Sequence, residues 1–210
     1  MAIDLKKTLD AYQAKRGAFR LVEVPPMQYL MVDGTGDPNT APAYAQALAA
    51  LFPLAYGLKF ASRKQLGIDT VVMPLEGQWH ADDMASFTTQ RDKSTWRWTL
   101  MIMVPEHVTG DMVEQVRAEA AKKKDASPSL LAVRFETLDE GLCVQTLHVG
   151  SYDDEAPVLD DLHTRFIPEH GLTMTGLHHE IYLSDARRVE PAKLRTILRQ
   201  PVARAEASDF

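Results

Sequence analysis

The chain of 210 residues has little cysteine, no excess of positive charge and no long apolar run. Its single cysteine, Cys143, allows no disulfide within the chain, which fits the reducing cytoplasm. The N-terminus lacks the apolar core of a signal peptide, and the longest apolar run, residues 99–104, is far shorter than the roughly 18 residues of a membrane span. A formal net charge of -6 argues against the basic face that nucleic-acid-binding domains carry. We therefore expect a cytoplasmic protein with neither a nucleic-acid nor a membrane partner.

Several motifs of enzyme chemistry are also missing. The sequence has no Gly-x-Ser-x-Gly turn for a serine nucleophile, and Gly34-Thr35-Gly36 lacks the third glycine of a dinucleotide-binding fingerprint. No two histidines have the helical i, i+4 spacing of zinc proteases. His179 and Glu180 are neighbours on a predicted strand, so they point to opposite faces and cannot easily share one ion. We expect neither a metal ion nor another cofactor.

An order of strand, glycine turn, helix and strand occurs twice along the chain. The first copy comprises residues 29–32, 33–37, 42–58 and 71–79, and the second comprises residues 142–149, 150–154, 156–166 and 177–183. The distance between the copies exceeds the period of about 20–50 residues that is typical of solenoids. The pattern therefore predicts a duplicated module.

The repeat also predicts how the chain is divided. A composition of 45% hydrophobic and 25% charged residues is ordinary for a globular protein with a buried core. We expect residues 1–210 to form one domain, with module one at about 17–126 and module two at about 127–205. The turn sequence Asp139-Glu140-Gly141 predicts a hairpin between residues 131–138 and 142–149.

Each copy ends in a strand that carries a glutamate close to an aromatic residue. Glu76 precedes Trp79 in the first copy, and Glu180 precedes Tyr182 in the second. For one copy alone, a glutamate that simply reaches solvent is the more usual outcome, because charged residues are mostly exposed. Two copies in matching contexts favour carboxylates in an aromatic-walled cleft, which suits a cationic or electron-poor aromatic ligand. We expect both glutamates to face one shared cleft.

Aromatic residues beside these strands are candidates for ligand contacts. Trp96 and Trp98 share one face of a predicted strand over residues 96–104, where core packing and a role in ligand binding are equally open. Trp79 follows a bend at Gly77, which favours the wall of a pocket over the core. Tyr152, in the second glycine turn, is a further candidate for ligand binding.

At these residues the chain resembles the GyrI-like small-molecule-binding proteins, specifically the stand-alone bacterial group of about this length. The resemblance runs from about Tyr29 to Val202. It is carried by residues 34–39, 75–79, 93–98 and 101–106, and most strongly by 178–185 and 193–201. The family pattern has a second aromatic residue after Trp79, where this chain has His80, so one pocket wall differs.

The resemblance implies an α+β fold. A tandem pair of strand-helix-strand-strand (SHS2-type) modules would be related by a pseudo-two-fold axis, with antiparallel sheets around a central ligand cleft. Relatives bind bulky hydrophobic, often cationic, aromatic compounds. Some stand-alone members hydrolyse the strained three-membered ring of cyclopropanoid DNA-alkylating natural products. Other relatives are drug-sensing domains fused to a DNA-binding head, for which this chain has no room.

The resemblance also implies roles for individual residues. In such a hydrolase Glu180 would position or deprotonate a water molecule, and Tyr182 would hydrogen-bond the water or the carboxylate. Glu76 would stabilise developing positive charge, and the electrophile would lie between Trp79, Trp98 and Tyr182. Two alternatives stay open: a xenobiotic-binding or sequestering protein without turnover, and an accessory protein that inhibits a partner such as gyrase. The second is less favoured because the acidic residues are scattered rather than massed.

Overall fold

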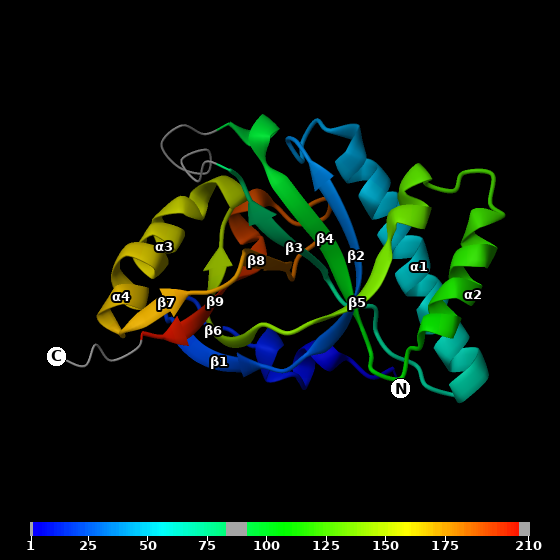
Figure 1. The fold of residues 1–210 in the computed structure, drawn as a ribbon, viewed down its shortest axis with the longest axis horizontal. Coiled ribbons are helices and arrows are strands. Elements are labelled where there is room, and N and C mark those ends of the chain that lie inside the picture. Colours follow the sequence, from blue (N-terminus) through cyan, green and yellow to red (C-terminus); the bar gives the residue numbers. More distant parts are fainter. Residues whose placement is uncertain (1, 83–91, 206–210) are drawn as a thin grey trace. The chain divides into compact units, whose positions relative to one another are not determined.

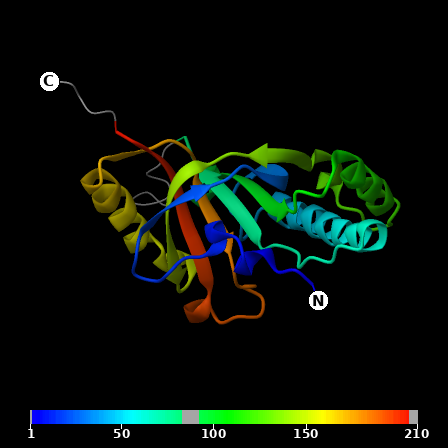
Figure 2. The same ribbon diagram turned by 90° about the horizontal axis from the view of Figure 1, so that it is seen from below.

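A computed structural model describes residues 2–82 and 92–205 of the protein. The chain divides into two compact units, each made of two segments. Unit 1 comprises Met1–Thr8 and Pro26–Leu138, and unit 2 comprises Leu9–Pro25 and Asp139–Phe210. Each unit combines helices with antiparallel strands, so the predicted α+β class is confirmed (Figures 1 and 2).

The strands described in unit 1 form an antiparallel sheet in the order β3-β4-β2-β5. These strands are β2 (Met27–Thr35), β3 (Leu75–His80), β4 (Arg97–Val104) and β5 (Arg134–Leu138). Helix α1 (Pro42–Leu66) packs against helix α2 (Gly110–Ala121), and α1 also contacts β2 and β4 (Figure 1). The helices thus cover the sheet that carries Glu76 and the tryptophans.

Helix α1 buries a stripe of small and aliphatic residues with helical spacing: Ala47, Ala50, Leu51, Leu54, Ala55 and Leu58. The helix continues through Pro53 and ends at Gly67, which has a left-handed backbone (φ 72°) of the kind that glycine accepts readily. It is therefore longer than the predicted range of 42–58. Helix α2 begins after Thr109, whose side chain accepts a hydrogen bond from the backbone N–H of Met112.

The strands described in unit 2 form an antiparallel sheet in the order β1-β6-β9-β8, and β7 also pairs with β9. These strands are β1 (Arg20–Val24), β6 (Gly141–Val149), β7 (Leu172–Met174), β8 (His178–Tyr182) and β9 (Arg195–Arg204). Between β6 and β7 the chain forms α3 (Ala156–Asp160), a π-helix (Asp161–Phe166) and α4 (Ile167–Glu169). The apolar core of this unit contains Val144, Leu162, Ile167, Leu172 and Val202.

The connectivity of the two units repeats. In unit 1 the elements β2, α1, β3 and β4 follow one another, and the strands are ordered β3-β4-β2. In unit 2 the elements β6, the helical segment, β8 and β9 follow one another, and the strands are ordered β8-β9-β6. The order of strand, helix and strand read from the sequence, and the further strand that the family resemblance implies, are therefore present in each unit. The pseudo-two-fold axis stays a prediction.

The predicted hairpin between residues 131–138 and 142–149 is wrong. Strand β5 pairs with β2 instead, whereas β6 pairs with β1 on one side and with β9 on the other. Both edges of β6 are thus occupied within its own unit. As a result, β5 belongs to unit 1 and β1 to unit 2, and here the units differ from the predicted module ranges.

Candidate functional site

Strand β8 of unit 2 presents three polar side chains on one face. Because side chains alternate along a strand, His178, Glu180 and Tyr182 share this face, and His179 points the other way. The Tyr182 hydroxyl donates a hydrogen bond of 2.7 Å to Oε2 of Glu180. Nε2 of His178 lies 3.4 Å from the other carboxylate oxygen, Oε1. Each oxygen of Glu180 therefore has its own neighbour from the same strand.

The Glu180 carboxylate is only partly exposed to solvent. Its side chain is 14% exposed and that of His178 is 11% exposed. Partial burial weakens solvent screening, so charges and hydrogen bonds around this carboxylate act more strongly than they would on an open surface. A carboxylate in this setting can take a proton from a water molecule, or hold a cation.

Tyr152 and Tyr182 form an aromatic pair next to this carboxylate. Their ring centroids are 5.5 Å apart in an edge-to-face arrangement, and Tyr152 remains 40% exposed. Burial, followed by the negative charges of Glu155, Glu180 and Asp185, raises the pKa of Tyr152 to about 12. Tyr152 thus lies in a negative field, which favours a positively charged ligand on an aromatic surface. The structure brings Glu180, Tyr182 and Tyr152 together.

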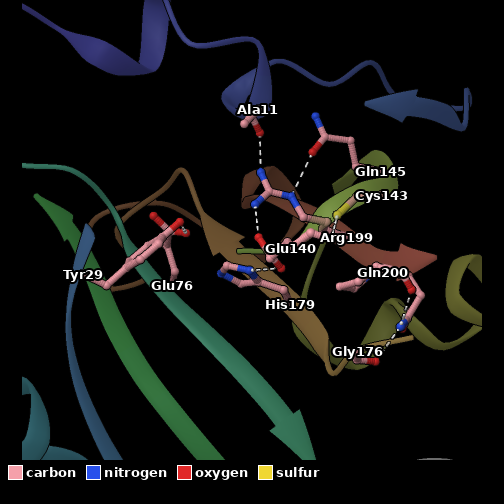
Figure 3. A network of polar contacts seen from close by, with 11 residues as sticks. Ala11, Tyr29, Glu76, Glu140, Cys143, Gln145, Gly176, His179, Arg199 and Gln200 are labelled. Atoms are coloured by element: carbon pink, nitrogen blue, oxygen red, sulfur yellow. Dashed lines mark hydrogen bonds and ion pairs between the residues drawn. The ribbon is translucent and has the colours of Figure 1, made fainter. Parts of the chain in front are cut away.

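The other three predicted site residues lie in unit 1. Glu76 is fully buried in β3, and the Tyr29 hydroxyl points to its Oε2 at 3.5 Å, at the long limit of a hydrogen bond (Figure 3). Trp79 of β3 is directly opposite Trp98 of β4 in the sheet register. A single cleft shared by Glu76 and Glu180 stays a prediction.

Both tryptophans are buried. Trp98 is 1% exposed, its Nε1 donates to the carbonyl oxygen of Gly36 at 3.2 Å, and its ring packs edge-on against Tyr44. The ring covers Gly34 so closely that a Cβ at this position would lie 1.9 Å from it, so only glycine fits there. Trp79 is 6% exposed and packs edge-on against Trp96. Core packing thus accounts for much of the tryptophan surface, and ligand contacts by Trp79 and Trp98 stay predictions.

A buried ionic network on the opposite side of β8 was not predicted from the sequence. The Glu140 carboxylate accepts a hydrogen bond from Nη1 of Arg199 at 2.7 Å and lies 2.9 Å from Nδ1 of His179 (Figure 3). Arg199 also donates to the side chain of Gln145 at 3.1 Å and to the carbonyl oxygen of Ala11 at 2.5 Å. These contacts connect β8, β9 and β6 to the N-terminal segment of unit 2.

The network holds Glu140 in its charged form. Burial alone would raise the pKa of Glu140, but the charges and hydrogen bonds of His179 and Arg199 outweigh it and lower the pKa to about 2. Cys143 lies beside the network, where its thiol contacts the carbonyl oxygen of Glu140 at 3.7 Å. Burial, followed by the charge of Glu140, raises the pKa of this thiol to about 12. These residues hold β8 in place rather than react.

The described residues contain neither a cluster of metal ligands nor a membrane-spanning helix. Over residues 2–82 and 92–205, no three His, Cys, Asp or Glu side chains lie together as a metal site would require. No helix in the same residues has the length and apolar character needed to cross a membrane.

Comparison with known proteins gives a family and close structural relatives. The model of the GyrI-like small molecule binding domain matches residues 18–203. An uncharacterized conserved protein from Listeria innocua is 37% identical, with a TM-score of 0.86 over 96% of this chain and 100% of the other. A hydrolase from Listeria innocua is 35% identical, with a TM-score of 0.82 over 96% and 100% of the two chains.

A further hydrolase from Listeria innocua is 34% identical, with a TM-score of 0.84 over 97% of this chain and 100% of the other. Comparison with curated proteins gives no significant match. The relatives span the whole of both units, so the likeness concerns the full architecture rather than one module.

Proposed function

Because the chain belongs to the family of GyrI-like small-molecule-binding proteins, we propose that it binds bulky hydrophobic, cationic aromatic molecules and hydrolyses the three-membered ring of cyclopropanoid genotoxins. The observation that carries this proposal is the partly buried Glu180 carboxylate, which is hydrogen-bonded by Tyr182 and adjoins the Tyr152 ring. Two relatives described as hydrolases cover the chain almost completely at 35% and 34% identity, which supports an enzymatic role.

In the proposed reaction a water molecule adds across one bond of the strained ring. Glu180 takes a proton from the water as its oxygen attacks the ring carbon. The carbon–carbon bond of the ring breaks, and its electron pair passes into the electron-withdrawing group conjugated with the ring. That group takes up a proton from solvent and Glu180 releases its proton to solvent, so the base is regenerated and the product is a ring-opened alcohol with the atoms of one water added. Relief of ring strain makes a base of ordinary strength sufficient.

Tyr182 and Tyr152 have supporting roles in this proposal. The Tyr182 hydroxyl fixes one oxygen of Glu180, which leaves the remaining lone pairs of the carboxylate for the water. The exposed part of Tyr152 offers an aromatic surface in the field of three carboxylates. We assign Glu76, Trp79 and Trp98 to ligand contacts as well, on the ground of the sequence repeat. The protein would work in the cytoplasm, without a metal ion or other cofactor.

Turnover separates hydrolysis from sequestration. Incubation of the protein with a cyclopropanoid compound should yield the ring-opened alcohol, detected by mass spectrometry as a product heavier by one water. The rate should rise in proportion to protein concentration and should exceed the rate with heat-denatured protein. Tight binding of the compound without any product would contradict the hydrolase and would leave a xenobiotic-binding protein.

Binding can be tested separately with a fluorescent, planar aromatic cation. We expect a Kd of roughly micromolar, about -8 kcal/mol, and clearly weaker binding by Tyr152→Leu. Tyr56→Leu is a matched control, because Tyr56 is a 49% exposed tyrosine on α1 of unit 1. If both variants bound the dye as the wild-type protein does, the Tyr152 surface would not be the binding site.

A further inference from the structure

One histidine of unit 2, His178, lies beside the Glu180–Tyr182 pair, and a second, His163, packs against it. His178 is the first residue of β8 and shares a face with Glu180. Its Nε2 is 3.4 Å from Oε1 of Glu180, and at this distance the buried nitrogen makes no hydrogen bond in the structure. In ligand-free active sites such contacts are often long and tighten when the substrate binds. The geometry thus places a nitrogen opposite the one carboxylate oxygen that Tyr182 does not contact.

His163 supports the position of the His178 ring. The two ring centroids are 6.2 Å apart and the rings are nearly perpendicular, at 88°. His163 lies on the π-helix Asp161–Phe166, and π-helical turns are rare and are found frequently at functional sites. Burial, followed by the charge of His178, lowers the pKa of His163 to about 4. His163 is therefore neutral near pH 7, so it exerts no charge repulsion on its neighbour.

The framework behind these histidines is fixed by backbone contacts. The Gln200 side chain, on the neighbouring strand β9, donates through Nε2 to the carbonyl oxygen of Gly176 at 2.8 Å (Figure 3). A Cβ at Gly176 would lie 2.9 Å from Cγ of Pro201, so this loop fits tightly against β9. The loop at Gly176 leads directly into His178, so its tight fit restricts the start of β8.

From these contacts we propose that His178 is a positioning residue for Glu180. Its Nε2–H donates to Oε1 while the Tyr182 hydroxyl donates to Oε2, so the carboxylate is held from both sides and directs its remaining lone pairs at one water. The inference rests on the proposed hydrolase, because Glu180 is the base in that reaction. It adds a residue that does not touch the substrate, and whose effect passes through Glu180.

The kinetic test compares two replacements of His178. His178→Leu removes the donor and should lower kcat by about 10- to 100-fold with little change in KM, as expected for one lost hydrogen bond to a charged group. His178→Gln retains an N–H group of similar reach and should recover most of the rate. His170→Leu is the control, because His170 is an exposed histidine of the same unit and should keep the wild-type kcat.

A second measurement does not depend on turnover. With ¹⁵N-labelled histidine, the resonances of His178 should show a hydrogen on Nε2, and the Nε2 resonance should move in Glu180→Gln but not in His170→Leu. If the wild-type protein has no hydrolase activity but this contact is seen, the hydrolase fails and the positioning contact stands. If Nε2 of His178 carries no hydrogen, the inference is overturned. So does a wild-type kcat in His178→Leu when the wild-type protein is active.

Discussion

Replacement of Glu180 by glutamine is expected to lower kcat for a cyclopropanoid substrate about 10²–10⁴-fold. Glutamine keeps the shape of the side chain and can still contact Tyr182, but it cannot take a proton from water. Binding should change much less than kcat, because Tyr152 and its aromatic neighbour Tyr182 are untouched. The measurement is kcat from product formation, together with Kd from titration with the same substrate under single-turnover conditions.

Three companion variants sharpen this result. Tyr182→Phe should cost less than Glu180→Gln, because it removes only an orienting hydroxyl. Trp98→Ala should weaken binding and also destabilise the fold, because the ring is 1% exposed and packs against Tyr44. Glu169→Gln replaces an exposed glutamate of the same unit and should leave kcat unchanged. Turnover by Glu180→Gln at the wild-type rate would remove Glu180 from the mechanism, and loss of activity with a chelator would restore a metal-based alternative.

Replacement of Arg199 by methionine is expected to destabilise the fold by about 3–5 kcal/mol. Arg199 is fully buried and donates hydrogen bonds to three groups. Its loss would remove the ion pair with the Glu140 carboxylate. It would also remove the hydrogen bonds to the side-chain oxygen of Gln145 and the carbonyl oxygen of Ala11. Removal of one partner leaves the other charge buried without compensation. The free-energy cost of that buried charge accounts for most of the lost stability. Urea unfolding followed by far-UV circular dichroism measures the difference.

An exposed arginine of the same unit provides the control. Arg187 pairs with Asp185 on the surface, where water screens the interaction, so Arg187→Met should have a much smaller effect. Equal destabilisation by the two variants would show that the buried network is not a special source of stability.

The same network should make stability depend on acid pH. The folded pKa of Glu140, about 2, is below its ordinary value of 4.5, so the unfolded chain takes up a proton at Glu140 first as the pH falls. The contribution of Glu140 is therefore complete above about pH 4.5 and is lost as the pH falls toward 2. In Glu140→Gln, this part of the pH dependence should be absent from urea unfolding curves.

Much of the fold could be predicted from apolar periodicity. Strands β2, β4 and β6 could be read because they are rich in apolar residues, and α1 because it has a clear helical stripe; the complete strand-helix-strand-strand module came from the family resemblance. Strand β9 is harder to read, because its buried positions include Thr196, Arg199 and Gln200, whose polar side chains hide the strand pattern. The partners that compensate them, such as Glu140, are distant in sequence.

The candidate site was predictable only in part, for a similar reason. Alternation along β8 was enough to place Glu180 and Tyr182 on one face, and their hydrogen bond followed. The same alternation includes His178, but its distance from Glu180 and the approach of His163 depend on the folding of the helical segment. Periodicity also assigns Trp98 to one face of its strand, but it does not indicate which residues pack on that face. In the structure these residues are Tyr44 and Gly34.

If the protein hydrolyses alkylating agents as proposed, it has to survive its own substrates, and the environment of Cys143 bears on this. Soft electrophiles attack thiolates first, and Cys143 is the only cysteine in the chain. Because it is fully buried and its pKa is raised to about 12, it is almost entirely in the thiol form at neutral pH. The protein therefore offers such a compound no reactive sulfhydryl as a competing target. Hydrolysis could then proceed through many turnovers without suicide inactivation at sulfur.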